Sequence, residues 1–246
     1  MSDPVAMIMP MAGRGSRFAA EGETLPKPLI ELHEQPFFYW ATRGIIDVLP
    51  EVQLIYVVLQ EHVEHFSIDK AVIERFPQAI VHIVPQLTSG ALETVLLGLQ
   101  DVAKQSHIII NDCDHAFIYP RIKAACSALS NGTDGFLSHF HSTAPHFSYA
   151  RYDSAGWLLQ TAEKKVISDS AIAGIYGFKN REVLETAAKI YQEDCPYPEL
   201  FISGVYNTMV AMTKKVQGFD LSRHVAFGTP EEFRTAVGQL PELYGS

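Results

Sequence analysis

The sequence predicts an α/β fold with a Rossmann-like sheet, mixed but mainly parallel, that carries helices on both faces. Short apolar runs of β character alternate with helical patterns over the first half of the chain. This alternation is typical of parallel strands joined by crossover helices. The chain has 246 residues, 47% hydrophobic and 19% charged, which is enough to bury the core of such a domain.

In the first half, apolar runs that end in glycine, proline or polar turns predict buried strands at residues 5–9, 53–59, 79–84 and 107–110. Helical patterns predict the connecting helices at residues 35–48, 61–75 and 90–102. In the first of these helices, Phe38, Ala41 and Ile45 recur at helical spacing and form one apolar face.

The second half of the chain changes to shorter strands separated by polar turns. We expect strands at residues 134–141, 148–153, 157–161 and 172–178, and helices at residues 181–192, 203–212 and 230–237. The last helix has Thr229 at its N-cap and Glu232 at the capping-box position. Because no internal repeat or linker interrupts the pattern, we expect residues 1–246 to form a single domain.

Composition limits the kinds of partner that the protein can bind and the cellular compartment in which it can be expected. A formal net charge of −9 argues against nucleic acid and against an anionic membrane as a partner. The cysteines form no CxxC pair, which favours a reducing cytoplasm. The N-terminus lacks the basic region of a signal peptide, and no apolar stretch approaches the ~20 residues that cross a bilayer. We expect a cytoplasmic protein, and homo-oligomer formation stays open.

A glycine loop with the sequence Met-Ala-Gly-Arg-Gly-Ser-Arg-Phe follows the first predicted strand, at residues 11–18. Gly13 and Gly15 let the backbone turn and approach a ligand, and free N–H groups in such a turn attract anions. Arg14 and Arg17 add guanidinium groups suited to phosphate oxygens. The loop is neither a Walker A loop nor a dinucleotide fingerprint. An ordinary strand-to-helix turn is the alternative interpretation.

A second motif, Leu-Pro-Lys-Pro-Leu at residues 25–29, places Lys27 between two prolines. The prolines restrict the backbone on both sides of Lys27, so that its charge has a defined position. Such a charge suits the neutralisation of a triphosphate and of leaving pyrophosphate. The alternative is a solvated lysine in a proline-rich surface turn.

These two motifs together resemble the signature of the sugar-nucleotide pyrophosphorylases, which are nucleotidyltransferases with a GT-A-like fold. The resemblance extends over most of the chain and is closest to small members of the capsule-polysaccharide type. It implies that Arg17 and Lys27 are catalytic and act on the phosphates. It also implies that the glycine loop binds the nucleotide through Ala12, Gly13, Arg14, Gly15 and Ser16.

The segment from Gln86 to Gly90 follows the third predicted strand. A glutamine amide can both donate to and accept from a base edge, and a glycine lets the base approach the backbone. The resemblance implies that Gln86, Ser89 and Gly90 contact the nucleotide. The alternative is a helix N-terminus capped by Thr88 or Ser89, and both roles can coexist.

Asp112 and Asp114 directly follow the fourth predicted strand, where an open α/β sheet binds its ligands. Carboxylates are suitable ligands for Mg²⁺, which also coordinates phosphate oxygens. The resemblance implies that one aspartate here binds the metal, and the usual order favours Asp114 over Asp112. The alternative is that one of the two only caps a helix. We do not expect His115 to be a metal ligand.

The Glu-Lys pair at Glu163 and Lys164 resembles the acceptor-side motif of the same family. It implies that Glu163 binds acceptor hydroxyl groups and that Lys164 binds the acceptor phosphate. Without the other motifs, solvated charges on an exposed hairpin would be the simpler interpretation. Further acceptor-pocket positions implied by the resemblance, or by location near an apolar helix, are Tyr149, Gly174, Glu199 and Asn207.

One segment departs from the family pattern. Many sugar pyrophosphorylases carry a late aspartate that completes the metal site, before a Gly-Thr pair. Phe227 stands here instead and cannot bind a metal ion. The substitutes that the sequence offers as a second ligand are Asp112, Glu199 and Asp220.

The motifs predict an enzyme of the nucleotidyltransferase type (EC 2.7.7), with nucleotide-binding residues 1–115 and acceptor-binding residues 116–246. The expected reaction transfers a nucleoside monophosphate from a nucleoside triphosphate to a phosphorylated acceptor and releases pyrophosphate, with Mg²⁺ as cofactor. The acceptor is a sugar 1-phosphate or a small phosphorylated metabolite, and the resemblance implies a role in surface polysaccharide synthesis.

Other functions stay open at this point. Asp112-Cys-Asp114 also has the form of the DxD motif of GT-A glycosyltransferases, which use a nucleotide sugar. A catalytically inactive nucleotide-binding regulator is a further alternative because of Phe227. The choice among CTP, UTP, dTTP and GTP stays open, although relatives of this small type include cytidylyltransferases.

Overall fold

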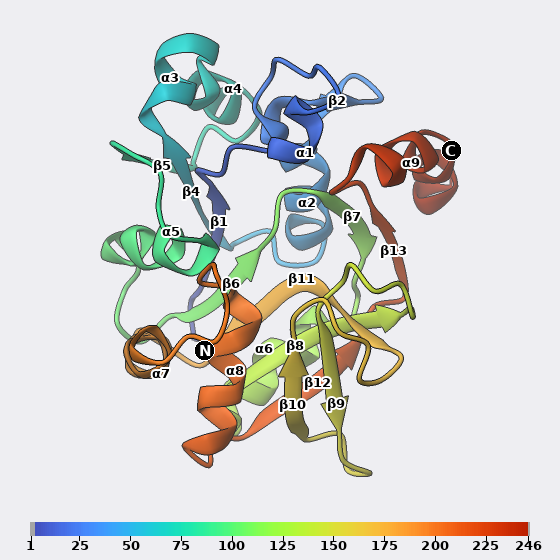
Figure 1. Cartoon of the computed structure of the whole chain (residues 1–246). Coiled ribbons are helices and arrows are strands. Elements are labelled where there is room, and N and C mark those ends of the chain that lie inside the picture. The colour runs from blue at the N-terminus through green and yellow to red at the C-terminus, as the bar shows by residue number, and fades with distance from the viewer. Residues whose placement is uncertain (1–2, 246) are drawn as a thin grey trace.

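A computed structural model of the protein describes residues 3–245. A nine-stranded sheet runs through the molecule (Figure 1). Seven of its strands follow the order β10-β9-β11-β6-β1-β4-β5; in addition, β8 pairs with β11, and β12 pairs with β8. The parallel part consists of β1 (Val5–Met11), β4 (Gln53–Leu59), β5 (Ile80–Val84) and β6 (His107–Asn111).

The strands of the second half make the sheet mixed. They are β8 (Gly135–His141), β9 (Tyr149–Tyr152), β10 (Leu158–Ala162), β11 (Ser170–Phe178) and β12 (Val216–Asp220). Strand β11 runs antiparallel to both β6 and β8, whereas β12 runs parallel to β8. The predicted fold class, an α/β protein with a mixed and mainly parallel sheet, is confirmed.

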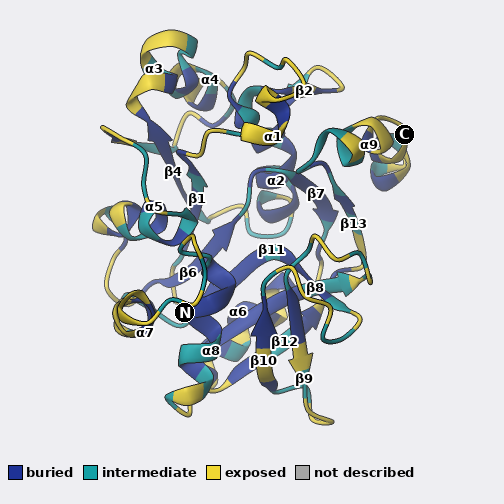
Figure 2. Ribbon diagram, in the orientation of Figure 1, coloured by how far each residue is buried: buried dark blue, intermediate teal, exposed yellow. Residues whose placement is uncertain are grey.

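Helices cover both faces of the sheet because side chains along each strand alternate between the two faces. In β1, Ala6 and Ile8 belong to one core cluster, and Met7 and Met9 belong to the other. The first cluster is closed by α5 (Ala91–Gly98), α7 (Arg181–Glu193) and α8 (Ile202–Ala211). The second is closed by α2 (Phe37–Ile46), α4 (Ile68–Arg75) and α6 (Ile122–Ser130). The central strands are accordingly buried, whereas the edge strand β5 and the outer helix faces are more exposed (Figure 2).

A third, smaller core lies beside the main sheet. It is built on the two-stranded sheet of β7 (His115–Ile118) and β13 (Arg223–Ala226), on the short helix α1 (Ser16–Ala19) and on α9 (Pro230–Tyr244). Phe227 is fully buried there, with its ring centroid 4.5 Å from that of Phe37. The capping box of α9 is confirmed, since Thr229 and Glu232 exchange hydrogen bonds.

Several element boundaries differ from those predicted. The helix predicted at 61–75 is two helices, α3 (Gln60–Phe66) and α4, because Ser67 adopts a left-handed φ of 52°. The helix predicted at 90–102 ends earlier and continues as the 3₁₀ turn η2 (Leu99–Asp101). Residues at the start of the helix predicted at 35–48 instead form β3 (Gln35–Pro36), which pairs with β2 (Glu31–Leu32). Apolar spacing persists across such breaks and therefore hides them.

Some short elements were not predicted. They are α1, the 3₁₀ turn η1 (Lys27–Leu29), β2, β7, α6, β12 and β13. Most are too short to show a period. Conversely, α9 was predicted to end at residue 237, but it continues past Pro241 and ends at Tyr244. No helix in the described part of the chain is long and apolar enough to cross a membrane.

The strand order positions the ligand site. Along the chain, the parallel strands occur as β1, β4, β5 and β6, but in space β1 lies between β4 and β6. The chain therefore winds outward from β1 in both directions, and a crevice opens between the carboxyl ends of β1 and β6. The glycine loop follows β1, and Asp112 to Asp114 follow β6, so both motifs lie at this switch point.

Two helical glycines provide a matched test of core packing. A Cβ on Gly44, in α2, would lie 2.4 Å from the Phe117 ring, whereas a Cβ on the exposed Gly238, in α9, would meet nothing within 4 Å. We expect Gly44→Ala to lower the free energy of unfolding by about 1–3 kcal/mol through overpacking. Gly238→Ala should raise it by about 0.5–1 kcal/mol through helix propensity. Urea denaturation measures both, and equal stability of the two variants would contradict this packing.

Candidate active site

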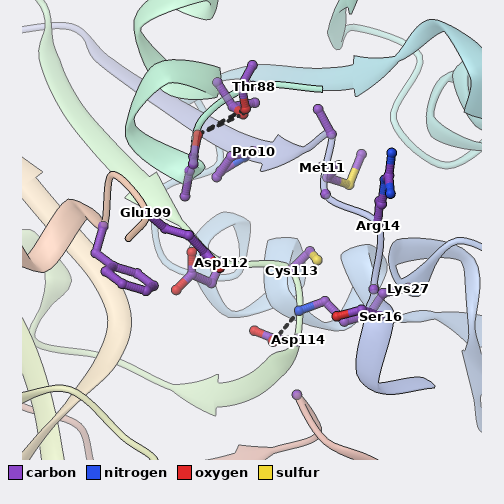
Figure 3. Close-up of a pocket in the computed structure, with 18 of the residues that line it drawn as sticks. Pro10, Met11, Arg14, Ser16, Lys27, Thr88, Asp112, Cys113, Asp114 and Glu199 are labelled. Carbon is purple, nitrogen blue, oxygen red and sulfur yellow. Dashed lines mark hydrogen bonds and ion pairs between the residues drawn. The ribbon is translucent and has the colours of Figure 1, made fainter. Parts of the chain in front are cut away.

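A cavity of about 740 Å³ opens at the switch point between β1 and β6. It brings together motifs that are far apart in the sequence (Figure 3). The nucleotide-side wall consists of the glycine loop, Lys27, the segment 87–91 and Asp112 to Asp114. The opposite wall consists of side chains from the second half of the chain, His146, Glu163, Lys164, Glu199 and Phe201, together with Gly228. The motifs predicted to bind nucleotide and acceptor thus face one common space.

The glycine loop packs directly on the lysine motif. A Cβ on Gly15 would lie 2.9 Å from the Lys27 Cβ, so only glycine allows this approach without a shift. Phe18 anchors the end of the loop, because its ring is buried against Phe37 and Phe233. Arg14 and Arg17 are exposed, and neither has an ion pair with a described residue. Both guanidinium groups are therefore free to bind an anion.

Lys27 and Asp114 form an ion pair at the base of the cavity. The Lys27 Nζ donates a hydrogen bond to the Asp114 Oδ2 over 2.7 Å, and both side chains are about three-quarters buried, at 25% and 23% exposure. Burial alone would lower the pKa of Lys27, but the charge and hydrogen bond of Asp114 raise it above its usual range. Burial likewise disfavours ionised Asp114, but Lys27 outweighs burial and holds the Asp114 pKa low. Both groups are charged at neutral pH.

Asp112 lies in a different environment from Asp114. Its backbone N–H donates to the Gly174 carbonyl over 2.9 Å. A Cβ on Gly174, whose φ is +70°, would lie 2.8 Å from the Asp112 Oδ2. The predicted site residue Gly174 therefore acts by leaving room for Asp112. Burial, followed by the negative charges of Asp114 and Glu163, raises the pKa of Asp112.

His115 is held as a neutral residue by its neighbours. Asn111 donates through Nδ2 to the Ala41 carbonyl, so its Oδ1 accepts from the His115 Nε2. The other ring nitrogen, Nδ1, lies 3.2 Å from the His224 Nε2. Burial lowers the pKa of His115 to about 4. Both nitrogens are occupied, which leaves His115 unsuited to metal binding.

The carboxylates around Asp114 are the candidates for binding a metal ion. Among the described residues, no group of three or more His, Cys, Asp or Glu side chains could hold a metal ion by itself. Phe227 is a core residue, but the next residue, Gly228, borders the site: a Cβ there would lie 2.5 Å from the Asp114 Oδ2. Asp220 is 72% exposed and pairs with His139 outside the cavity, so of the substitutes only Asp112 and Glu199 line the site.

The segment 87–91 is held in place by the second half of the chain. A Cβ on Gly90 would lie 2.6 Å from the Leu200 backbone nitrogen, and Leu92 N–H donates to the Leu200 carbonyl over 3.0 Å. Glu93 accepts hydrogen bonds from both the backbone N–H and the hydroxyl of Ser89, over 2.6 and 2.5 Å. Ser89 and Gly90 line the cavity.

On the acceptor side, Glu163 and Lys164 both reach the cavity, as predicted. The Glu163 Oε2 accepts hydrogen bonds from the hydroxyls of Ser148 and Ser203. Lys164 adopts a left-handed φ of 50°, and its Nζ lies 5.1 Å from the centre of the Phe201 ring. The ammonium group thus rests on an aromatic face and is not engaged in an ion pair with any described carboxylate.

Four predicted site residues lie off the cavity wall, and the first is Gly174, which packs against Asp112. Gln86 is exposed and points to no cavity. Tyr149 is fully buried, and its hydroxyl donates to the Ala144 carbonyl over 2.7 Å. Asn207 uses both ends of its amide on the backbone of Thr161, over 2.8 and 3.0 Å. The polar groups of Tyr149 and Asn207 are satisfied within the protein, which local sequence does not reveal.

Sequence reasoning missed several residues that border the site. His146 lines the cavity from the loop before β9, and its Nε2 lies 2.8 Å from the Glu232 Oε1 at the start of α9. Ser148 and Ser203 were not identified because a serine that contacts a functional carboxylate has no sequence signature. Glu232 was identified only as a helix cap. The capping box was its single signal, and it gave no indication of the cavity.

Comparison with known proteins supports the interpretation of these motifs. A family model for MobA-like NTP transferase domains matches residues 8–173. The nucleoside-diphosphate-sugar pyrophosphorylase from Vibrio cholerae RC9 is 27% identical, with a TM-score of 0.80, covering 95% of this chain and 100% of that one. Among curated proteins, none matches the chain.

Two more distant structures share the fold. A UDP-glucose pyrophosphorylase complexed with UDP-glucose is 15% identical, with a TM-score of 0.75, covering 97% of this chain and 99% of that one. The inositol-1-phosphate CTP transferase from T. maritima is 13% identical, also with a TM-score of 0.75, covering 98% of each chain. The family match spans the glycine loop, Lys27, Asp114 and the Glu163–Lys164 pair. The chain therefore belongs to the family of MobA-like NTP transferase domains and is a nucleotidyltransferase.

Proposed function

We propose that the protein transfers a nucleoside monophosphate from a nucleoside triphosphate to a phosphorylated small molecule. The observation that carries this proposal is the single cavity in which Lys27 and Asp114 face Lys164 and Glu163. In this proposal, residues 1–115 of one domain bind the nucleotide and residues 116–246 bind the acceptor. Cations on both sides of one space suit two phosphate-bearing substrates that must meet.

The proposed reaction is an in-line displacement at the α-phosphorus. An oxygen of the acceptor phosphate forms a bond to that phosphorus, while the bond to the bridging oxygen of the β-phosphate breaks and pyrophosphate leaves. A phosphate monoester is already anionic at neutral pH, so no general base is needed. Catalysis then depends on positioning and on neutralisation of charge.

Each cationic residue has a distinct proposed role. The Lys164 ammonium group, which pairs with no carboxylate among residues 3–245, orients the acceptor phosphate. Arg17 and Lys27 neutralise the charge that develops on leaving pyrophosphate. Lys27 already lies at the base of the cavity through its ion pair with Asp114, and phosphate oxygens compete with Asp114 for it. The nucleotide contacts proposed for the loop residues 12–16 are supported by their place on the cavity wall.

We further propose that Mg²⁺ binds beside Asp114, with Asp112 as the second carboxylate. The residues fit this ion: the donors are carboxylate oxygens, both Asp112 and Asp114 line the cavity, and Gly228 and Gly174 place no side chain against their Oδ2 atoms, where a Cβ would collide. Because no described group of three or more ligating side chains surrounds this place, Asp114 and Asp112 would hold the ion together with substrate phosphate oxygens and water. When bound, Mg²⁺ supplies positive charge to the phosphate oxygens.

The acceptor is proposed to be a sugar 1-phosphate or a small phosphorylated metabolite, for surface polysaccharide synthesis in the cytoplasm. The description of the Vibrio cholerae relative as a nucleoside-diphosphate-sugar pyrophosphorylase supports a sugar phosphate. The T. maritima CTP transferase, which shares only the fold, uses a phosphorylated polyol and supports testing CTP.

A screen of pyrophosphate release tests the reaction itself. CTP, UTP, dTTP and GTP are each combined with a panel of sugar 1-phosphates and phosphorylated alcohols. We expect release with at least one pair, and only when both substrates are present. Nucleotide binding without release would indicate a binding protein, and turnover of a nucleotide sugar without pyrophosphate would indicate glycosyl transfer.

Replacement of Lys27 tests the leaving-group role. We expect Lys27→Ala to lower kcat at least a hundredfold, because a charge that acts mainly in the transition state contributes about 3 kcal/mol. Lys104→Ala, at an exposed position outside the cavity lining, is the matched control and should retain wild-type turnover. Circular dichroism checks that both variants are folded. Near-normal turnover of folded Lys27→Ala would overturn the assignment.

Removal of the metal tests the role of Asp114. We expect EDTA to abolish pyrophosphate release and excess Mg²⁺ to restore it. Mn²⁺ binding in the presence of nucleoside triphosphate, followed by electron paramagnetic resonance, should weaken at least tenfold in Asp114→Asn, since a ligating charge is lost. Asp220→Asn, outside the cavity, is the control and should bind Mn²⁺ as the wild type does. Unchanged Mn²⁺ affinity in Asp114→Asn would exclude Asp114 as a ligand.

A further inference from the structure

The carboxylate of Glu163 is held from one side by two serines. Ser148 Oγ donates to the Glu163 Oε2 over 2.5 Å, and Ser203 Oγ donates to the same oxygen over 2.8 Å. The other oxygen, Oε1, has no hydrogen bond to any residue that the structure describes, although Glu163 lines the cavity. One carboxylate oxygen is thus used to fix the side chain, and the other is available to a ligand.

Ser203 is itself held rigidly. It is 2% exposed, and its carbonyl accepts a hydrogen bond from the Thr161 Oγ1 over 2.8 Å. One helical turn later, Asn207 binds both the N–H and the carbonyl of Thr161. Helix α8 is therefore fastened to the end of β10, two residues before Glu163. The hydroxyl of Ser203 and the backbone of Glu163 cannot move independently.

The start of α8 is also fastened to the nucleotide side of the cavity. Leu200, just before the helix, donates through its N–H to the Ser89 carbonyl over 3.1 Å and accepts from the Leu92 N–H over 3.0 Å. Gly90 fits against the same Leu200 backbone. Ser203 thus belongs to a segment that is anchored to both walls of the cavity.

Ser148 approaches Glu163 from a different element. It lies in the loop before β9, and its carbonyl accepts a hydrogen bond from the Ile172 N–H over 2.8 Å, which ties this loop to β11. The two serine donors therefore come from separate parts of the acceptor half, a loop and a helix. A free glutamate side chain samples many rotamers, and ordering it in one of them costs conformational entropy. Two fixed donors meet that cost before any ligand binds.

We propose that Ser148 and Ser203 are positioning residues that hold Glu163 with its free oxygen directed at a hydroxyl group of the acceptor. This inference rests on the proposed function, because it assigns the role of acceptor contact to Glu163. It predicts that the serines affect acceptor binding through Glu163 alone and leave nucleotide binding unchanged. A purely structural role would instead affect stability and both substrates alike.

The test compares Ser148→Ala, Ser203→Ala and the double variant with the wild type, in the pyrophosphate-release assay. Ser168→Ala is the matched control, because its hydroxyl donates to the Ala150 carbonyl in the same half of the chain but does not reach Glu163. We expect each single variant to raise the acceptor KM about tenfold, the usual effect of losing a hydrogen bond to a charged group. The KM for the nucleoside triphosphate and the KM values of Ser168→Ala should stay within twofold of the wild type. The Ser148→Thr variant keeps a hydroxyl group at this position, so its acceptor KM should match that of the wild type.

A second readout separates positioning from a direct contact. In a Glu163→Ala background, adding Ser148→Ala and Ser203→Ala should leave the acceptor KM within twofold, because the serines no longer have a carboxylate to hold. If the two serine substitutions raise the acceptor KM equally in the wild-type background and in the Glu163→Ala background, the proposal is overturned. An unchanged acceptor KM in the double serine variant overturns it as well.

Crystal structures of the wild type and of the double serine variant complete the test without depending on turnover. We expect one Glu163 conformation in the wild type and a displaced or multiple conformation in the variant. An identical Glu163 conformation in both overturns the positioning role. If the wild type releases no pyrophosphate with any substrate pair, the proposed function fails, and the crystallographic comparison still decides whether the serines hold Glu163.

Discussion

The ion pair between Lys27 and Asp114 is the interaction on which the nucleotide side of the site depends. It joins residues 87 positions apart, because β1 and β6 are adjacent parallel strands whose following segments leave the sheet at the same edge. A charged side chain removed from water needs a partner, and here each of the two is the partner of the other. The pair therefore keeps both groups at the base of the cavity before any ligand arrives.

The acceptor side is organised by neutral hydrogen-bond donors rather than by an ion pair. Two serines hold Glu163, and Lys164 rests on the Phe201 ring without an ion pair to any carboxylate that the structure describes. The difference has a physical consequence. The lysine on the nucleotide side is compensated in the free protein, whereas Lys164 is available for an incoming phosphate. Segment 199–203 contacts both sides through Leu200 and Ser203, so that neither wall of the cavity is built independently of the other.

Much of the candidate site could be predicted from the sequence because most of its motifs directly follow predicted strands and Lys27 is marked by the prolines on both sides of it. The glycine loop, Lys27, Asp114 and the Glu163–Lys164 pair all line the cavity. Prediction failed for polar side chains that could form hydrogen bonds either with a ligand or with the protein backbone. Asn207 binds the backbone of Thr161, and Tyr149 binds that of Ala144, although both residue types and their locations suited an acceptor pocket. Such partners lie in other elements and leave no local pattern.

The sequence by itself determined the order of the parallel strands and of the main helices between them, the glycine loop, the Pro-Lys-Pro motif and the acidic residues after β6, because hydrophobic periodicity and proline or glycine placement are local properties. It could not detect the break at Ser67, since apolar spacing continues through it. Only the tertiary structure decided that Phe227 belongs to a core, that Gly228 borders Asp114 and that Ser148 and Ser203 meet at Glu163. These relations join segments that are distant in the sequence, and only the packing of the sheet and its helices brings them within contact distance.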